Sequence, residues 1–183
     1  CDKLRYAALT NEALASGDSA YRIDLKFDKD ARTLTIADNG IGLDQQDLID
    51  NLGTIARSGT AAFLDSVSGG KKEDAPSEGG DVNLIGQFGV GFYSAFMVAD
   101  EVTVESLSAL PDAKAICWKS DGGEGYDLSE GSRTTRGTSI TLKLREEAKD
   151  FADEGKLRDI IRKHSDFVPH PIKIGDDQIN RAK

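Results

Sequence analysis

Alternation of apolar and polar residues marks the strands of this chain. Residues 21–27 (YRIDLKF) and 33–37 (TLTIA) alternate with a period of two, and the short polar link between them predicts an antiparallel hairpin. Residues 137–144 (GTSITLKL) show the same period, which would place Ile140 and Leu142 on one face and Thr141 on the other. The pattern predicts further strands at residues 101–106, 115–120 and 125–128, and a final edge strand at 171–175.

Apolar residues that recur every three or four positions predict the helices, beginning with a short one at residues 2–9. A second helix at 44–52 would carry Leu48, Ile49 and Leu52 on one side, and residues 92–99 form an apolar helical run. Together these elements predict an α+β fold over residues 1–183, a two-layer sandwich with a mostly antiparallel sheet and helices on one face. In a last helix, 156–167, the expected inner residues are Leu157, Ile160, Ile161 and either His164 or Phe167.

Composition narrows the range of partners. The chain of 183 residues carries a formal charge of −9, which argues against nucleic acid as a partner, since phosphate binding requires a basic surface. Its two cysteines and two histidines show no metal-ligand spacing, and their pattern fits a reducing, intracellular setting. The sequence has no run of about 18 apolar residues, so no membrane partner is expected.

The predicted hairpin runs into residues 38–42 (DNGIG), which combine a carboxylate with two glycines. At a strand end, Asp38 can accept a hydrogen bond from an exocyclic amine such as adenine N6. Gly40 and Gly42 would let a flat ligand approach the backbone. Asn-Gly is also a strong signal for a plain reverse turn, so the local sequence supports both a base-binding site and a turn.

A second glycine motif lies at residues 86–91 (GQFGVG), just before the apolar run. Such a loop can direct backbone N–H groups at a phosphate, or it can be a flexible connection. The polar residues 68–81 before it fit either a lid over a bound nucleotide or an ordinary loop. Arg57 could reach an anionic ligand or face solvent, and Thr138 could contact a ligand or simply favour the strand.

Four motifs follow one another along the chain: residues 38–42 (DNGIG), 51–60 (NLGTIARSGT), 86–94 (GQFGVGFYS) and 136–138 (RGT). In this combination nearly the whole chain closely resembles the nucleotide-binding domain of the 90-kilodalton heat-shock chaperones, and the bacterial branch more than the mitochondrial one. Gyrase-type topoisomerases, mismatch-repair ATPases and histidine kinases belong to the same superfamily. The resemblance implies the Bergerat ATP-binding fold that these proteins share.

The resemblance also implies an ATPase that binds ATP or ADP with Mg²⁺ under a lid at about residues 53–92. Asp38 would bind the adenine amino group with help from Thr138. Arg57 stands where the family usually has Lys, which changes the geometry of any phosphate contact. Client proteins and a homodimer are the implied partners, without nucleic acid or membrane, in the bacterial cytoplasm. The implied ATP-binding residues are Asp38, Gly40, Gly42, Leu43, Asn51, Leu52, Arg57, Gly86, Gln87, Phe88, Gly89, Val90, Gly91, Phe92 and Thr138.

Two functional residues of the family precede the motif found here at residues 2–6 (DKLRY). The glutamate that activates the attacking water and the asparagine that ligates magnesium would both lie upstream of Cys1. The resemblance therefore assigns no catalytic or metal-ligating residue within the chain, and we expect weakened nucleotide binding and negligible turnover from it alone. Two alternatives stay open: another ATPase of the superfamily, of the kinase, topoisomerase or mismatch-repair type, or a binding module without turnover.

Overall fold

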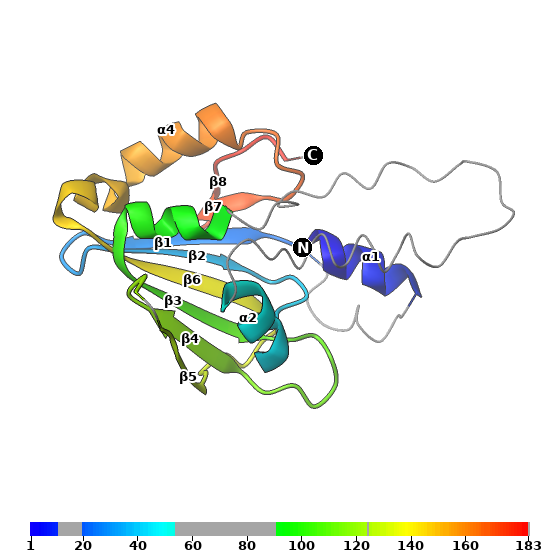
Figure 1. Ribbon diagram of the computed structural model, residues 1–183. Helices are drawn as coiled ribbons and strands as arrows, with labels where there is room; N and C mark the ends of the chain where they lie inside the picture. Colours follow the sequence, from blue (N-terminus) through cyan, green and yellow to red (C-terminus); the bar gives the residue numbers. More distant parts are fainter. Residues whose placement is uncertain (11–19, 54–90, 124, 183) are drawn as a thin grey trace, which may run out of the picture.

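The structure, a computed structural model, describes residues 1–10, 20–53, 91–123 and 125–182. The strands in these residues form one sheet in the order β5-β4-β3-β6-β2-β1-β7-β8 (Figure 1). Neighbouring strands are antiparallel, except that β1 and β7 are parallel. The strands are β1 (Ile23–Asp28), β2 (Thr33–Asp38), β3 (Ala99–Leu107), β4 (Ile116–Ser120), β5 (Asp127–Glu130), β6 (Gly137–Leu144), β7 (Ile172–Ile174) and β8 (Asp177–Gln178). The helices are α1 (Asp2–Thr10), α2 (Gln45–Leu52) and α4 (Glu154–His164), with the 3₁₀ helices η2 (Gly91–Met97) and η3 (Glu146–Ala152).

The predicted hairpin of β1 and β2 is confirmed. Ile23 pairs with Asp38 and Asp28 with Thr33, so the two strands are in full antiparallel register. At the turn, Asp28 Oδ1 accepts a hydrogen bond from Ala31 N at 2.8 Å, and Arg32 adopts a left-handed φ of 52°. This local chemistry reverses the chain within a few residues and places the end of β2 at the opposite end of the sheet from the turn.

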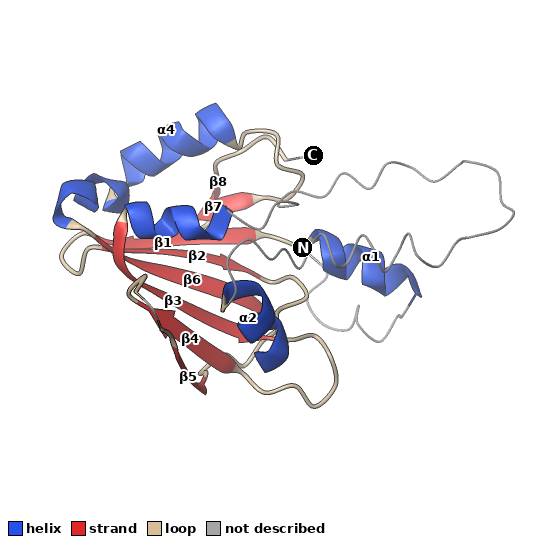
Figure 2. Cartoon of the chain, in the orientation of Figure 1, coloured by secondary structure: helices blue, strands red, loops and turns tan. Residues whose placement is uncertain are grey.

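Helices lie over one face of the sheet (Figure 2), and this face carries the main hydrophobic core. Residues of one parity on β2, β3, β4 and β6 point into it, as the period of two requires. Side chains from α2, η3 and α4 close the other side, and the aromatic residues of η2 pack against the cluster. The buried members are Leu34, Leu48, Ala99, Val102, Val104, Trp118, Leu142, Leu144, Ala152 and Leu157.

The opposite face of the sheet is polar. Thr35 on β2 and Thr141 on β6 pair across the strands, and their hydroxyl oxygens lie 2.9 Å apart. Lys26 on β1, which pairs with Thr35, and Lys119 on β4, which pairs with the Thr103 neighbour of Thr141, are exposed on the same face. The molecule therefore has two layers, helices and sheet, and the predicted α+β class is confirmed.

Three expectations at element ends differ from the structure. The apolar run after Gly91 is a 3₁₀ helix that stops at Met97, because β3 begins at Ala99. Neither candidate for the last inner position of α4 is buried: His164 is exposed, and Phe167 is 83% exposed because α4 ends at His164, where Ser165 N caps it by donating to Ile161 O. The strand predicted at 171–175 is β7, which is not the edge strand, because the chain turns at Gly175 and adds β8 outside it.

Helix length in the described part of the chain is modest. No helix there is long and apolar enough to cross a membrane.

Candidate functional site

Three polar side chains at the ends of neighbouring strands form the candidate site: Ser106 on β3, Thr138 on β6 and Asp38 on β2. Ser106 pairs with Thr138 across β3 and β6. On the other side of β6, Ser139 pairs with Ala37, so Asp38 follows at the level of Thr138. Side chains alternate along a strand, which puts all three on the core-facing side of the sheet. We call Ser106, Thr138 and Asp38 the polar row.

An incompletely covered apolar surface adjoins the polar row. Ile36 and Ile140 pair across β2 and β6, one step further into the sheet on the same face. Ile36 is 37% exposed, although Leu34 two residues earlier is 7% exposed within the core. Ile140 is partly buried. The helices of the described chain thus leave part of this face open, and the two isoleucines, here called the apolar floor, can take a flat apolar ligand.

The loop after β2 holds Asp38 in a defined position. Asp38 Oδ1 accepts a hydrogen bond from Gly40 N at 2.7 Å, while Oδ2 has no partner among the described residues. Ile41 O accepts from Ala109 N at 2.7 Å, which joins the loop to the chain after β3. One carboxylate oxygen is therefore used to shape the loop, and the second is not used by the described residues.

Both glycines of this loop are required by packing within the protein. Gly42 has a φ of 69°, and a Cβ there would lie 2.0 Å from Leu107 O. A Cβ on Gly40 would lie 2.5 Å from Cys1 N, at the start of α1. At both glycines, the backbone of the loop lies in close contact with another part of the backbone. Gly40 contacts Cys1 beside α1, and Gly42 contacts the end of β3.

Two residues outside the predicted site residues brace Asp38. Asn39 Oδ1 accepts from Arg22 N at 2.9 Å, and its Nδ2 donates to Ala20 O at 2.9 Å. Arg133 Nη2 donates to Asp38 O at 3.3 Å and to Arg136 O at 3.2 Å, and its Nη1 donates to Ser139 Oγ. Asn39 lies in a recognised turn motif, but Arg133 lies in an irregular loop whose sequence carries no signal for this role.

The helix after the loop begins with a reciprocal cap. Asp44 Oδ1 accepts from Asp47 N at 2.8 Å, and Asp47 Oδ2 accepts from Asp44 N at 3.2 Å. Burial raises the pKa of Asp47, with the nearby charge of Lys3 opposing the shift. Burial also lowers the pKa of Lys3 on α1, against the attraction of Asp47. The opposite charges of a partly buried Lys3 and an exposed Asp47 thus lie between α1 and α2.

The other predicted site residues in and just before α2 contact that helix, the core or the polar row. Asn51 Nδ2 donates to Asp47 O at 2.7 Å, and Leu52 packs against the main core. Leu43 packs there too, and its backbone N–H donates to Ser106 Oγ at 2.8 Å. Through Leu43, α2 is coupled directly to the polar row.

Phe92 lies in an aromatic cluster next to the start of η2. Its ring centroid is 5.6 Å from that of Trp118 and 6.1 Å from that of Phe96, both in edge-on geometry. Gly91 just before it is exposed, with no atom within 4 Å of a Cβ position. The structure thus anchors one end of the glycine motif in the core, and Gly91 O accepts a hydrogen bond from Ser94 Oγ at 2.5 Å.

The described structure brings together one part of the predicted site. Asp38, Gly40, Gly42, Leu43 and Thr138 lie around the polar row, while Asn51 and Leu52 lie on α2 and Gly91 and Phe92 on η2. The predicted lid at about residues 53–92 falls almost entirely on residues 54–90, which lie outside the described residues. So do the site residues Arg57, Gly86, Gln87, Phe88, Gly89 and Val90.

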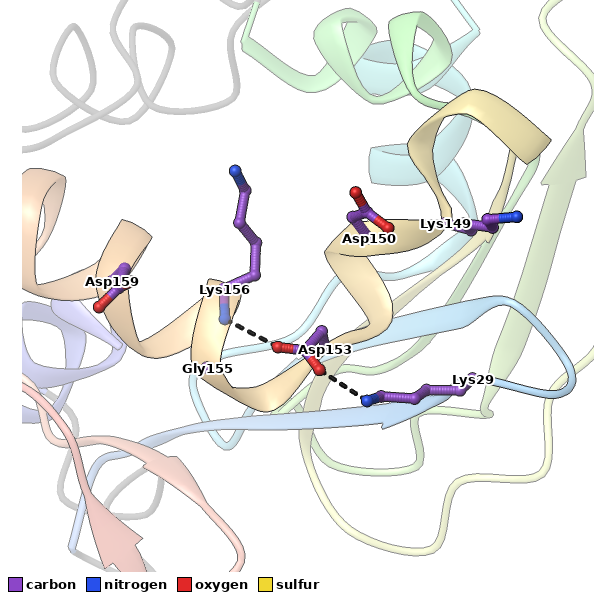
Figure 3. Close-up of a pocket in the computed structure, with 7 residues that line it drawn as sticks. All are labelled: Lys29, Lys149, Asp150, Asp153, Gly155, Lys156 and Asp159. Atoms are coloured by element: carbon purple, nitrogen blue, oxygen red, sulfur yellow. Dashed lines mark hydrogen bonds and ion pairs between the residues drawn. The ribbon is translucent and has the colours of Figure 1, made fainter.

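A hollow of about 550 Å³ lies apart from the polar row, beside the β1–β2 turn (Figure 3). Lys29 Nζ bonds Asp153 Oδ2 at 2.6 Å, and Asp153 Oδ1 accepts from Lys156 N at 3.1 Å at the start of α4. These contacts join the β1–β2 turn to the start of α4, so the residues that line the hollow have a structural role. Across the described ranges, no three acidic, histidine or cysteine side chains are grouped as metal ligands.

The amino-acid sequence is similar to those of a known protein family. The family of histidine kinase-, DNA gyrase B- and HSP90-like ATPases matches residues 11–120. The chaperone protein HtpG of Rhodospirillum rubrum is 54% identical over 94% of the chain, and that of Polaromonas sp. is 50% identical over 97%. HtpG of Desulfitobacterium hafniense is 48% identical over the whole chain. The chain spans 27 to 29% of the length of these three relatives.

Proposed function

Because the chain belongs to the family of histidine kinase-, DNA gyrase B- and HSP90-like ATPases, we propose that its polar row and apolar floor bind the adenine of ATP or ADP. The observation that carries the proposal is the position of Asp38 and Thr138 beside the partly exposed Ile36. A purine ring needs an apolar surface to cover its face and polar groups to bind its edge. The site offers both within two neighbouring strands.

The chemistry of each side chain fits a 6-aminopurine. The Asp38 carboxylate is a hydrogen-bond acceptor, and its Oδ2 is open to an amine donor such as the adenine N6 group. Ile36 and Ile140 would cover the base, where burial of apolar surface favours binding by about 25 cal/mol per Å². Asn51 and Leu52 would border the ribose side.

For the phosphates we propose the glycine motif at residues 86–91, of which Gly91 belongs to the described chain. Backbone N–H groups of such a loop can bind phosphate oxygens without a side chain in the way. Arg57 would add a positive charge, and Phe92 would hold the end of the motif against Trp118. Mg²⁺ would be bound with the nucleotide and neutralise its phosphates.

For the whole gene product we propose an ATP-driven chaperone, since the similar proteins are named chaperone protein HtpG. Hydrolysis would be attack of water on the γ-phosphate, a reaction that proteins accelerate by positioning and charge stabilisation. Residues 53–92 would form the lid over the nucleotide. Client proteins and a homodimer are the partners that this activity would require.

Calorimetric titration of the full gene product with ADP and Mg²⁺ tests the site. Asp38→Asn replaces the carboxylate while keeping a side-chain oxygen for Gly40 N. Loss of a charged hydrogen-bond acceptor is worth about 1.5–3 kcal/mol, so we expect ADP affinity to fall by about tenfold to a hundredfold. Asp30→Asn, in the exposed β1–β2 turn, is the matched control and should bind ADP like the wild type. Equal affinity of Asp38→Asn and wild type would refute the proposed role of Asp38.

A further inference from the structure

The hydroxyl of Ser106 is the junction of three hydrogen bonds behind the candidate site. Its Oγ accepts from Leu43 N at 2.8 Å and lies 3.2 Å from Gly137 O and 2.8 Å from Thr138 Oγ1. The residue is 0% exposed, so water cannot replace any of these partners. A buried hydroxyl must find its hydrogen-bond partners within the protein, so it favours one arrangement of the neighbouring groups.

The number of hydrogens decides how the three bonds are arranged. A serine hydroxyl has one hydrogen and two lone pairs. The Leu43 N–H can only donate, so it uses one lone pair; the Gly137 carbonyl can only accept, so it takes the Ser106 hydrogen. The Thr138 hydroxyl must then donate its own hydrogen to the second lone pair of Ser106.

The reverse arrangement is less favourable. If Ser106 donated to Thr138, no hydrogen would lie between Ser106 Oγ and Gly137 O, and two oxygens 3.2 Å apart would face each other with lone pairs. Gly137 is also paired with Leu107 across β3 and β6, and its carbonyl has a second lone pair for the Ser106 hydroxyl. The reverse arrangement would lose this hydrogen bond, worth about 1 kcal/mol, and would bring the two oxygens together without a hydrogen between them.

We infer that Ser106 is a specificity-determining residue that holds Thr138 as a hydrogen-bond acceptor toward the ligand. With its hydrogen bound to Ser106, Thr138 presents only lone pairs to the site, next to the Asp38 carboxylate, which is also an acceptor. Two acceptors side by side favour a 6-amino purine, whose substituent donates, and disfavour a 6-oxo purine, whose substituent accepts. The inference rests on the proposed binding of adenine at the polar row.

The test compares ADP with inosine diphosphate, which carries a 6-oxo group, by calorimetry on the full gene product. In Ser106→Ala the Thr138 hydroxyl is free to turn and donate to the 6-oxo group. We expect the ADP-to-IDP affinity ratio to fall by about tenfold, the change that one mismatched hydrogen bond produces. Because both ligands are measured on the same protein, a general loss of affinity or stability cancels in the ratio.

Two further variants separate this role from a structural one. In a Thr138→Val background, which lacks the hydroxyl, Ser106→Ala should leave the affinity ratio unchanged. Ser120→Ala removes another buried serine, which also donates to a glycine carbonyl and accepts from a glycine N–H, and it should keep the wild-type ratio. The inference is overturned if Ser106→Ala keeps the wild-type ratio, or if it changes the ratio equally with and without Thr138.

Failure of the proposed function would look different. If wild-type protein bound no ADP, or if Asp38→Asn bound it unchanged, the adenine site itself would be wrong. If Asp38→Asn lost ADP while Ser106→Ala kept the wild-type ratio, the adenine site would stand and only the role of Ser106 would fall.

Discussion

Gly42 and Gly175 both adopt left-handed backbone conformations, with φ of 69° and 59°, but in different surroundings. A Cβ on Gly42 would meet Leu107 O at 2.0 Å, whereas a Cβ on Gly175 would meet nothing within 4 Å. The pair separates two effects that usually occur together, the conformational preference of glycine and the lack of room for a side chain. At Gly42 both effects maintain the loop that carries Asp38.

Substitution of the two glycines by alanine should therefore have unequal effects on stability. We expect Gly175→Ala to lower the free energy of unfolding by about 1 kcal/mol, from conformational strain alone. Gly42→Ala should lower it by about 3 kcal/mol or more, because the end of β3 must move. Urea denaturation of both variants measures the difference. Equal losses of unfolding free energy in the two variants would mean that the loop and the end of β3 can move apart at no energetic cost.

Residues of the polar row differ in how far the sequence predicts them. Asp38 stands out because it follows a strand and precedes two glycines. Ser106 carried a usable signal as well: it has the same parity as Val102 and Val104, so a polar side chain occupies a core-facing position. Arg133 has no such signal, because a long side chain in an irregular loop can reach many partners and only the folded structure selects Asp38 O and Ser139 Oγ.

At the scale of the element, α2 shows how a short helix is held. Its reciprocal cap of Asp44 and Asp47 satisfies backbone N–H groups at the N-terminus, and Leu48 is 0% exposed in the core. The apolar spacing of residues 44–52 predicts this helix closely. The cap also places Asp47, the third residue of the helix, where partial burial raises its pKa.

The raised pKa of Asp47 predicts a pH dependence of stability. Its folded-state pKa lies above the ordinary value of 3.8, so the folded protein binds this proton more tightly than the unfolded chain does. The stability that the bound proton confers is present below pH 3.8 and is lost as the pH rises through the folded-state pKa. Asp47→Asn keeps an oxygen for Asp44 N and removes the titration.

Urea denaturation between pH 3.5 and about 6 measures this effect, a range set by the direction of the shift. The difference in unfolding free energy between Asp47→Asn and wild type should move in favour of the variant as the pH rises. Asp30→Asn, on the exposed turn, controls for the loss of one negative charge. A difference that stays constant with pH would show that burial does not act on Asp47 in this way.

At the scale of the whole molecule, the site depends on pairings between distant parts of the chain. Strand β6 lies between β2 and β3, which brings Thr138 between Asp38 and Ser106. Periodicity predicts where most of these strands lie, because it is a local property. Strand order depends on which faces and edges fit together, and the alternation within each strand leaves that order open. The site as a set of neighbours could therefore be predicted only through the family resemblance.

Contacts between distant parts also hold α1 against the loop of Asp38. Cys1 occupies the space beside Gly40, and Asp2 Oδ1 lies 2.9 Å from His170 Nε2, just before β7. His170 is 7% exposed, and its ring meets Tyr21 edge-on at 6.0 Å. Asn180 fixes this segment in turn, since its side chain bonds Ile172 N, Val168 O and His170 O. The C-terminal segment thus supports the first helix and, through it, the loop at the candidate site.

His170→Phe tests this long-range support, because it keeps a ring against Tyr21 and removes the hydrogen bond to Asp2. Loss of one buried hydrogen bond is worth about 1–1.5 kcal/mol, so we expect amide hydrogen exchange in α1 to speed up by about tenfold. Exchange in the paired strands β3 and β6 should be unchanged, since their ladder does not involve His170. His164→Phe, at the exposed end of α4, is the matched control. If α1 exchanged at the wild-type rate in His170→Phe, its position would come from its other contacts, such as the burial of Leu4 and the attraction of Lys3 to Asp47, and the loop at Gly40 would be independent of the C-terminal segment.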